Sequence, residues 1–320
     1  MRAGFVTVVG RPNVGKSTLV NRMVGAKVAI TSPRPNTTRH RVRGVLHRPG
    51  AQAVLVDTPG LHRPRTVLGE RLNQTAGESL ADVDAVVAVV DATAAVGPGD
   101  RMVLRRALDT GGPVLVAVNK VDRARPDQVL ERLDTVAGAV DELTGAGPRP
   151  APAPTTGDSG DSGDSGADDA DGAADDGRAD VEYFPVSATT GRGVDALVDA
   201  VLARLPEGPA YFPEGMVTDT PEALRVAELV REQLLRRVRE ELPHSIACRV
   251  TEWEWPHIRC EIVVERGSQK AIVIGRGGEV VKAVGTAVRK ELPPGAYLEL
   301  FVRVEKHWQQ RPDALDRLGY

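Results

Sequence analysis

The chain has 320 residues, of which 41% are hydrophobic and 27% charged, and this composition is typical of a globular protein with two domains. Its longest apolar runs, such as residues 85–90, are too short to span a bilayer, and no secretory pattern opens the sequence. The formal net charge of −3 hides a charge asymmetry, because residues 151–180 hold nine Asp and one Arg and leave +5 on the rest. Cys248 and Cys260 lack metal spacing, so we expect a protein of the reducing cytoplasm.

The first predicted elements are a strand over residues 5–9 and a helix over 16–26, with a phosphate-binding motif between them. Residues 10–17 read Gly-Arg-Pro-Asn-Val-Gly-Lys-Ser, which matches GxxxxGK[ST] in the required strand-to-helix context. Its glycines let backbone N–H groups turn toward phosphate oxygens, and the helix directs its positive end at the same charge. Lys16 is expected to reach the β- and γ-phosphates, and Ser17 to ligate Mg²⁺. The nucleotide-binding residues expected here are Gly10, Asn13, Val14, Gly15, Lys16, Ser17 and Thr18.

A second motif, Asp57-Thr58-Pro59-Gly60, closes a predicted strand over residues 53–57. We expect Asp57 to hold the metal through water and the Gly60 N–H to contact a γ-phosphate. This string is a weak signal alone and gains weight from its place at a strand end.

A third motif, Asn119-Lys120-Val121-Asp122, predicts that the base is guanine. Guanine presents two adjacent donors, N1–H and the 2-amino group, and the Asp122 carboxylate can accept both. Adenine lacks both donors there, so the mismatch should cost several kcal/mol, or about 10⁴-fold in preference. Asn119 is expected to tie this loop to the phosphate loop, and the Lys120 stem to cover the base. Ser187 and Ala188, after a further strand, offer backbone N–H groups to guanine O6.

Strands alternate with helices through the first two thirds of the chain, which predicts an α/β domain over residues 1–206 with a mostly parallel sheet and helices on both faces. Ligands then bind at the carboxyl ends of the strands. The predicted strands are 5–9, 53–57, 85–91, 114–119 and 181–187, and the predicted helices are 16–26, 67–81, 99–110, 126–143 and 193–205.

Residues 145–180 interrupt this alternation with a Pro-rich stretch, Gly-Asp-Ser repeats and an Asp/Ala/Gly tract. With almost no apolar side chains the segment cannot offset the entropy of ordering, so we expect disorder. It is either a tolerated surface insertion or an acidic decoy that competes with RNA for a basic surface.

After a linker at 207–218, residues 219–320 predict a second domain with the order αββααβ. Its GxxG string, Gly275-Arg276-Gly277-Gly278, joins a short helix to an amphipathic one. This domain resembles a KH domain of type II, an α+β fold whose GxxG loop clamps single-stranded nucleic acid. The predicted elements are helices 221–242, 268–274 and 279–291 and strands 246–254, 257–265 and 297–306.

The resemblance to a KH domain implies RNA binding by Ile274, Gly275, Arg276, Gly277, Gly278 and Lys282. Against it, residues 211–320 hold 17 basic and 17 acidic residues, so no net positive charge supports RNA binding. Trp253 and Trp255 fit either base stacking or exposed hairpin positions. A helix–turn–helix fold is the competing interpretation of this region.

Taken together, the motifs resemble a translation-factor-class GTPase, and the order of the two domains resembles the Era family of bacterial GTPases over nearly the full chain. By this similarity residues 35–39 form the first switch, and the Thr38 hydroxyl reaches Mg²⁺ together with Ser17 and Asp57. Asn13 resembles a residue that helps to bind K⁺ between the phosphates, although it also suits a plain loop turn. Leu61 stands where many GTPases place a water-orienting Gln, and His62 is a candidate polar neighbour.

The resemblance implies a GTPase with a catalytic set of Lys16, Thr38, Gly60 and Asn13 and a slow intrinsic rate, about 10⁻⁴ to 10⁻² s⁻¹, raised by a partner. It also implies binding to the 3′ end of 16S ribosomal RNA, a role in 30S assembly and peripheral contact with the inner membrane face. We further expect a monomer. The alternative is an RNA-binding assembly checkpoint for which GTP is mainly an ordering ligand. A third hypothesis is a GTPase that acts in tRNA modification, and the KH-like pattern argues against it.

Overall fold

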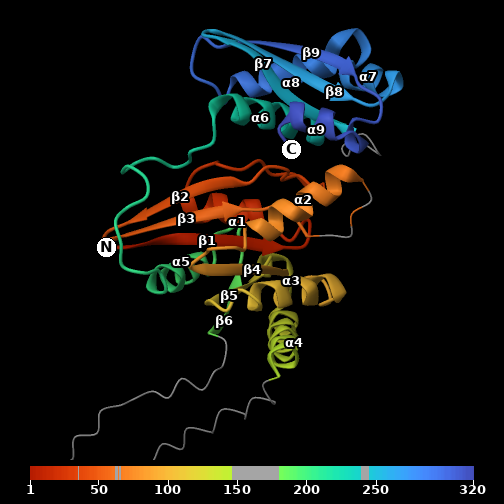
Figure 1. Cartoon of the computed structure of the whole chain (residues 1–320). Coiled ribbons are helices and arrows are strands. Elements are labelled where there is room, and N and C mark those ends of the chain that lie inside the picture. The colour runs from red at the N-terminus through yellow and green to blue at the C-terminus, as the bar shows by residue number, and fades with distance from the viewer. Residues whose placement is uncertain (35, 62–63, 65, 146–179, 239–244) are drawn as a thin grey trace, which may run out of the picture.

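The computed structural model describes residues 1–34, 36–61, 64, 66–145, 180–238 and 245–320. Two sheets, each covered by helices, lie one above the other in Figure 1. The predicted acidic insert falls outside the described residues except for Gly145 and Asp180 at its ends, and His62 falls outside them as well.

The first sheet has the strand order β2-β3-β1-β4-β5-β6, with parallel pairing throughout except that β2 runs antiparallel to β3. Alternate residues of β4 enter opposite cores: Ala85, Val87 and Val89 lie in one, and Val86, Ala88 and Val90 in the other. A strand that is covered on both faces must be apolar on both, which is why its sequence is a continuous apolar run. The strands are β1 (Arg2–Gly10), β2 (Val42–Arg48), β3 (Ala51–Asp57), β4 (Ala85–Asp91), β5 (Val114–Asn119) and β6 (Val181–Val186).

Helices α1 (Lys16–Val24) and α5 (Val194–Ala203) cover one face of this sheet. Helices α2 (Val67–Glu78), α3 (Pro98–Leu108) and α4 (Pro126–Thr144) cover the other face. The predicted α/β fold is therefore confirmed.

Strand β2 is a difference from the sequence analysis, which does not predict it. The strand lies at the edge of the sheet, and Gly44 together with the polar residues His47 and Arg48 weakens its apolar pattern. A two-residue turn, Pro49–Gly50, joins it to β3, because His47 pairs with Gln52 and Arg48 with Ala51. Gly50 has φ 72°, a left-handed value that favours glycine. The Pro-Gly pair between two strands is the signal that would have predicted this hairpin.

The second sheet has the order β7-β8-β9, with β7 and β8 antiparallel and β8 and β9 parallel. Helices α6 and α8 pack on it around a core that includes both cysteines, Cys248 and Cys260, which are buried and free. The α+β order of a KH domain is thus confirmed, although α6 ends at Arg237, where Val238 is extended. The elements are α6 (Glu222–Arg237), β7 (Ala247–Glu254), β8 (His257–Val264), α7 (Gly267–Ile274), η3 (Arg276–Gly278), α8 (Glu279–Arg289) and β9 (Tyr297–Val304).

Two further elements, η4 (Trp308–Gln310) and α9 (Pro312–Leu318), lie between the two sheets (Figure 1). Leu68 and Leu72 of α2 share a buried apolar cluster with Trp308 and Leu315. This interdomain cluster explains the burial of Trp308, whose indole N–H also donates to the Ser245 carbonyl at 3.1 Å. Within the described ranges, no helix is both long and apolar enough to cross a membrane.

Candidate functional site

The polar residues predicted from the three motifs and from the pair Ser187–Ala188 meet at the carboxyl ends of the strands of the first sheet. The register pairs Val8 with Asp57, Asp91 with Asn119, and Asn119 with Val186, so the ends of neighbouring parallel strands lie side by side. Loops that follow those ends therefore converge, as they do in open parallel sheets generally.

The phosphate loop runs from Gly10, the last residue of β1, to Lys16, the first of α1. Gly15 has φ 100°, and a Cβ built there would lie 2.4 Å from Asn119 Nδ2, so only glycine fits. The Lys16 Nζ donates to the carbonyls of Gly10 at 3.0 Å and Arg11 at 3.1 Å. Burial lowers the pKa of Lys16 to about 8, against the opposing effect of Asp57. A buried ammonium favours an anionic ligand, which a polyphosphate would supply.

An open hollow of about 400 Å³ lies over this loop and holds most of the predicted phosphate-site residues. Gly60 closes one wall, since a Cβ on it would lie 2.8 Å from the Pro12 nitrogen. Gly10 and Val14 do not line the hollow. Its lining comprises Pro12, Asn13, Gly15, Lys16, Ser17, Thr18, Ile30, Thr31, Ser32, Asn36, Thr37, Thr38 and Gly60.

Side-chain oxygens of Ser17 and Thr38, which line the hollow, gather around an oxygen of the buried Asp57. The Ser17 hydroxyl donates to Asp57 Oδ2 at 2.7 Å and lies 2.8 Å from the Thr38 hydroxyl, which itself donates to the same Oδ2 at 3.1 Å. Asp57 is fully buried, and its Oδ1 has no hydrogen-bond partner within the described chain. Burial raises the pKa of Asp57, although Lys16, Ser17 and Thr38 oppose the rise.

This oxygen cluster fits a hard divalent cation, because Mg²⁺ takes oxygen ligands and typically keeps several waters beside one or two carboxylates. The described residues contain no group of three or more His, Cys, Asp or Glu placed to hold a metal, so a single carboxylate with hydroxyls is the donor set available. The Thr37 hydroxyl instead donates to the Arg34 carbonyl at 2.7 Å, which leaves Thr38 as the threonine at this cluster.

The third motif and the pair Ser187–Ala188 meet at the other end of the site. Asn119 Nδ2 donates to the Val14 carbonyl at 2.8 Å, and its Oδ1 accepts the Ala188 N–H at 2.9 Å. The bond to Val14 is the tie to the phosphate loop that the sequence predicts for Asn119. The two N–H groups that are predicted to donate to guanine O6 have partners within the chain instead, because the Ala188 N–H donates to Asn119 and the Ser187 N–H donates to the Arg192 carbonyl at 2.8 Å. The Ser187 hydroxyl donates to Asp122 Oδ1 at 2.6 Å and so fixes the orientation of that carboxylate. The arrangement can present one oriented carboxylate to two adjacent donors.

Asp91 is a site residue that the sequence analysis misses. The Lys120 Nζ donates to Asp91 Oδ2 at 2.6 Å and to the Asn13 carbonyl at 2.7 Å, and Thr93 binds the other Asp91 oxygen. Asp91 stands at the end of β4, and the rule that strand ends carry function would have indicated it.

The predicted GxxG loop lies far along the chain, between α7 and α8. Gly275 has φ 75°, and a Cβ on it would lie 2.6 Å from Val280 Cγ2. Gly277 and Gly278 also have left-handed φ values, and a Cβ on either would meet no described atom within 4 Å. Arg276 and Lys282 are at least partly exposed, and Ile274 is half-buried at the end of α7. The loop can therefore bring a ligand close to bare backbone next to two cations.

The sequence matches two family models, a 50S ribosome-binding GTPase over residues 5–120 and a KH domain over residues 241–309. It is 44% identical to the GTPase Era of Mycobacterium avium over 332 aligned positions, which cover 100% of this chain and 99% of that protein. The relative from Mycobacterium tuberculosis is 43% identical, with 99% and 98% covered.

Two solved structures resemble the whole chain with a TM-score of 0.84, and each match covers 100% of this chain and 99% of the other. One is a single-residue variant of Aquifex aeolicus Era bound to GDP.AlF4⁻, at 35% identity. The other is Era in complex with MgGDPNP and nucleotides 1506–1542 of 16S ribosomal RNA, at 36% identity.

Proposed function

Because the chain belongs to the Era family of GTPases and hydrolyses GTP as one of them, we propose that it couples this reaction to binding of the 3′ end of 16S ribosomal RNA during assembly of the 30S subunit. Two features of the same chain carry the proposal. A complete set of nucleotide motifs lies at the carboxyl ends of the strands of the first sheet, and a GxxG loop lies in a KH fold.

Guanine specificity is assigned to Asp122, with Asn119, Lys120, Ser187 and Ala188 holding the base pocket together. The orientation of the Asp122 carboxylate by Ser187 supports this assignment. The test is Asp122→Asn, whose single amide oxygen can accept from only one of the two adjacent guanine donors, while its NH2 group can donate to the C2 carbonyl of xanthine. We expect GTP affinity to fall by at least about 10³-fold and xanthosine triphosphate to bind better than GTP. An unchanged choice between GTP and ATP would overturn the assignment.

The phosphate chain is assigned to the backbone of residues 10–18, Lys16 and the Gly60 N–H, and Mg²⁺ to Ser17, Thr38 and Asp57. The unpartnered Asp57 Oδ1 and the gathered hydroxyls support the metal assignment. When bound, Mg²⁺ supplies positive charge that offsets the charge developing on the phosphate oxygens.

A monovalent cation at Asn13 is a separate part of the proposal. The Asn13 amide nitrogen donates to the Pro33 carbonyl at 3.1 Å, so the side chain already bridges the phosphate loop and the segment that leads into the first switch. Its oxygen remains the candidate ligand for K⁺. Hydrolysis rates in K⁺ and Na⁺ at equal ionic strength provide the test, and equal rates would eliminate K⁺ from the mechanism.

RNA binding is assigned to the loop Ile274–Gly278 with Lys282. Accessible cations beside glycines with open space support a clamp on a nucleic-acid backbone. A fluorescent oligonucleotide with the 16S 3′-end sequence should bind more tightly than a scrambled one of equal length. Equal affinity for both would reduce the proposal to nonspecific RNA binding.

One observation favours the alternative function, in which GTP mainly orders an RNA-bound checkpoint. Leu61 is 2% exposed and packs in the core beside α2 and α3, so its side chain cannot orient an attacking water. Multiple-turnover phosphate release with and without 16S 3′-end RNA separates the two functions. Release that the RNA stimulates favours the coupled enzyme, and turnover that stays near the intrinsic rate with RNA or 30S subunits favours the checkpoint.

The cytoplasmic location, which the free cysteines support, and the monomeric state are further proposals, and the peripheral membrane contact is one that rests on the family resemblance. Sedimentation of the purified protein tests the monomer, and fractionation of cells into cytosol and membrane tests the location.

A further inference from the structure

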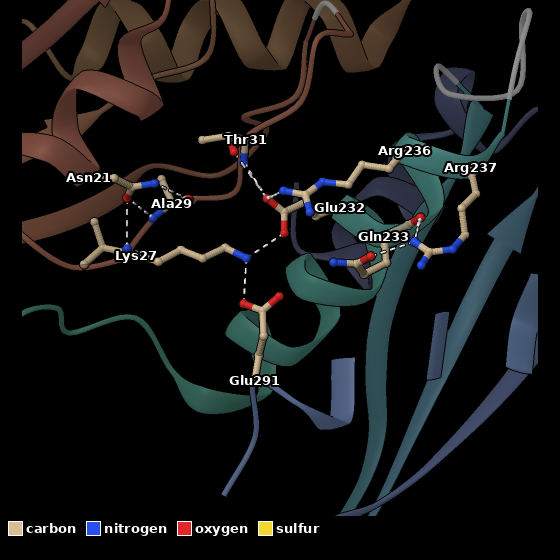
Figure 2. Close-up of polar contacts among 10 residues, drawn as sticks. Asn21, Lys27, Ala29, Thr31, Glu232, Gln233, Arg236, Arg237 and Glu291 are labelled. Atoms are coloured by element: carbon tan, nitrogen blue, oxygen red, sulfur yellow. Dashed lines mark hydrogen bonds and ion pairs between the residues drawn. The ribbon is translucent and has the colours of Figure 1, made fainter. Parts of the chain in front are cut away.

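The segment that carries the first switch contacts the KH domain at Thr31 (Figure 2) and the nucleotide site at Thr38. The backbone N–H of Thr31 donates to Glu232 Oε1 at 2.9 Å. Further along the same segment, the Thr37 carbonyl accepts a hydrogen bond from Arg231 Nη2. Two adjacent side chains of helix α6 therefore hold the two ends of segment 31–37.

Both side chains are fully buried charges, and each is neutralised by partners other than the switch. Glu232 Oε2 accepts from Lys27 at 2.7 Å, and Glu232 Oε1 accepts from Arg236 at 3.0 Å. Arg231 donates to both oxygens of Glu228, at 2.8 and 2.7 Å. A buried charge is stable only when it is paired and hydrogen-bonded, so these ion pairs fix both groups in place. The hydrogen bonds of these two side chains to the backbone of Thr31 and of Thr37 are then made by rigid partners.

The held segment leads directly to the proposed metal ligand. Thr37 and Thr38 share a peptide bond, and the Thr38 hydroxyl lies 2.8 Å from Ser17 Oγ and 3.1 Å from Asp57 Oδ2. Among the described residues of 31–41, none belongs to a helix or strand. A segment without its own hydrogen-bonded ladder depends on outside contacts for its position, and α6 supplies two of them.

From these contacts we propose that Glu232 and Arg231 are positioning residues for GTP hydrolysis, which hold the first switch so that Thr38 stays at the metal site. The KH domain thus contributes to the reaction through α6, separately from its GxxG loop. The inference rests on the metal-site role proposed above for Thr38.

The test compares the variants Glu232→Ala, Glu232→Gln and Arg231→Lys with the wild type, each as the full-length protein. Arg231→Lys keeps the charge opposite Glu228 but lacks the fork that also reaches Thr37. Because Thr38 acts on the triphosphate form with its metal, we expect single-turnover hydrolysis to slow by about tenfold or more in Glu232→Ala. The Mg²⁺ concentration for half-maximal rate should rise, while GDP affinity stays within about twofold of the wild type.

Gln233→Ala is the matched control, because Gln233 is the next residue of α6, is buried, and bonds to Arg237 of its own helix at 2.6 Å (Figure 2). It should lower thermal stability without changing the hydrolysis rate or the Mg²⁺ dependence. If the Glu232 variants do not fold, Arg231→Lys carries the test by the same readouts. Hydrolysis in the folded variants that matches the Gln233→Ala control would overturn the proposal.

Thr38→Ala separates this inference from the site assignment on which it rests. Slow hydrolysis in Thr38→Ala with normal rates in the α6 variants would leave the metal site standing and remove the positioning role. Normal hydrolysis in Thr38→Ala would overturn both.

Discussion

At the scale of single residues, Lys120 makes contacts whose effect on nucleotide binding can be tested by one substitution. Its Nζ is held between the Asn13 carbonyl and Asp91 Oδ2. Burial alone would raise the pKa of Asp91, but hydrogen bonds from Lys120 and Thr93 hold it below its ordinary value. The carboxylate is therefore ionised at neutral pH, and its bond to Lys120 is charge-assisted.

Asp91→Asn removes the negative charge opposite the Lys120 ammonium, which turns the ion pair into a hydrogen bond to a neutral acceptor and loosens the lysine stem proposed to cover the base. We expect the affinity for both GDP and GTP to fall by about tenfold, or about 1.4 kcal/mol, measured by titration with a fluorescent nucleotide. Asp82→Asn makes the same chemical change at an exposed turn and should have no effect. Wild-type affinity in Asp91→Asn would contradict the role of this residue.

Glu228 predicts a pH dependence of folding stability. Burial would raise its pKa, but Arg231 lowers it below the ordinary value of 4.5, so the folded state binds this proton more weakly than the unfolded state. The ionised Glu228 carboxylate therefore stabilises the fold above about pH 4.5, and this stabilisation is lost as the pH falls through the pKa of Glu228 in the folded state. At pH 6 Glu228→Gln should be less stable by about 3 kcal/mol, because it leaves Arg231 without its charge partner. Urea unfolding from pH 6 to pH 3 should show this gap narrowing below about pH 4.5; a constant gap would mean that Glu228 does not titrate differently in the two states.

At the scale of elements, the periodicity of apolar residues predicts those helices and strands whose packing requires such a pattern. It does not predict elements that are short or that are covered on one side only. Strands such as β4 are covered on both faces, so their continuous apolar runs identify them. Strand β2 lies at an edge, where Gly44, His47 and Arg48 weaken its apolar pattern. Helix α9 has only seven residues, too few to show a helical period. The nucleotide motifs are predictable because each is a short string at a strand end. Asp91 is marked only by its place at the end of β4. The α6 contacts join residues distant in sequence, so no local pattern encodes them.

The GxxG loop gives a prediction for a turn that only glycine can make. Gly275→Ala would place a Cβ 2.6 Å from Val280 Cγ2 and 2.9 Å from the Val280 nitrogen, so the start of α8 must move. We expect RNA affinity to fall by at least about tenfold while GTP affinity is unchanged. Gly295→Ala is the control, because Gly295 has φ 93° in the same domain and no described neighbour within 4 Å of an added Cβ. Equal RNA binding by the two variants would contradict a specific role for the loop.

At the scale of the whole molecule, two different kinds of contact connect the domains. An apolar one joins Leu68 and Leu72 of α2 to Trp308 and Leu315, and a charged one joins Lys27 to Glu232 and Glu291, at 2.7 and 2.6 Å (Figure 2). The two contacts lie on different parts of the first domain, so together they fix its orientation relative to the second.

Leu72→Ala tests the apolar contact. Leu72 is 3% exposed, and its truncation should cost about 2–3 kcal/mol and increase the population of molecules with separated domains. Small-angle scattering should report a larger radius of gyration for this variant. Leu104→Ala removes the same side chain from the core of the first domain alone, so it should lose similar stability without a change in radius. Equal radii for the two variants would contradict a role for Leu72 in holding the domains.

Because the two native cysteines are buried, movements of the two domains relative to each other can be followed with fluorescent labels on introduced cysteines. Cys248 and Cys260 lie in the core of the second domain, and burial raises the pKa of both thiols, that of Cys260 to about 12. Since maleimide dyes react with exposed thiolates, neither native cysteine should take up a label in the folded protein. A cysteine introduced on the surface of each domain would then accept a donor and an acceptor fluorophore in the otherwise natural sequence, and energy transfer between them would measure domain separation during a GTP cycle.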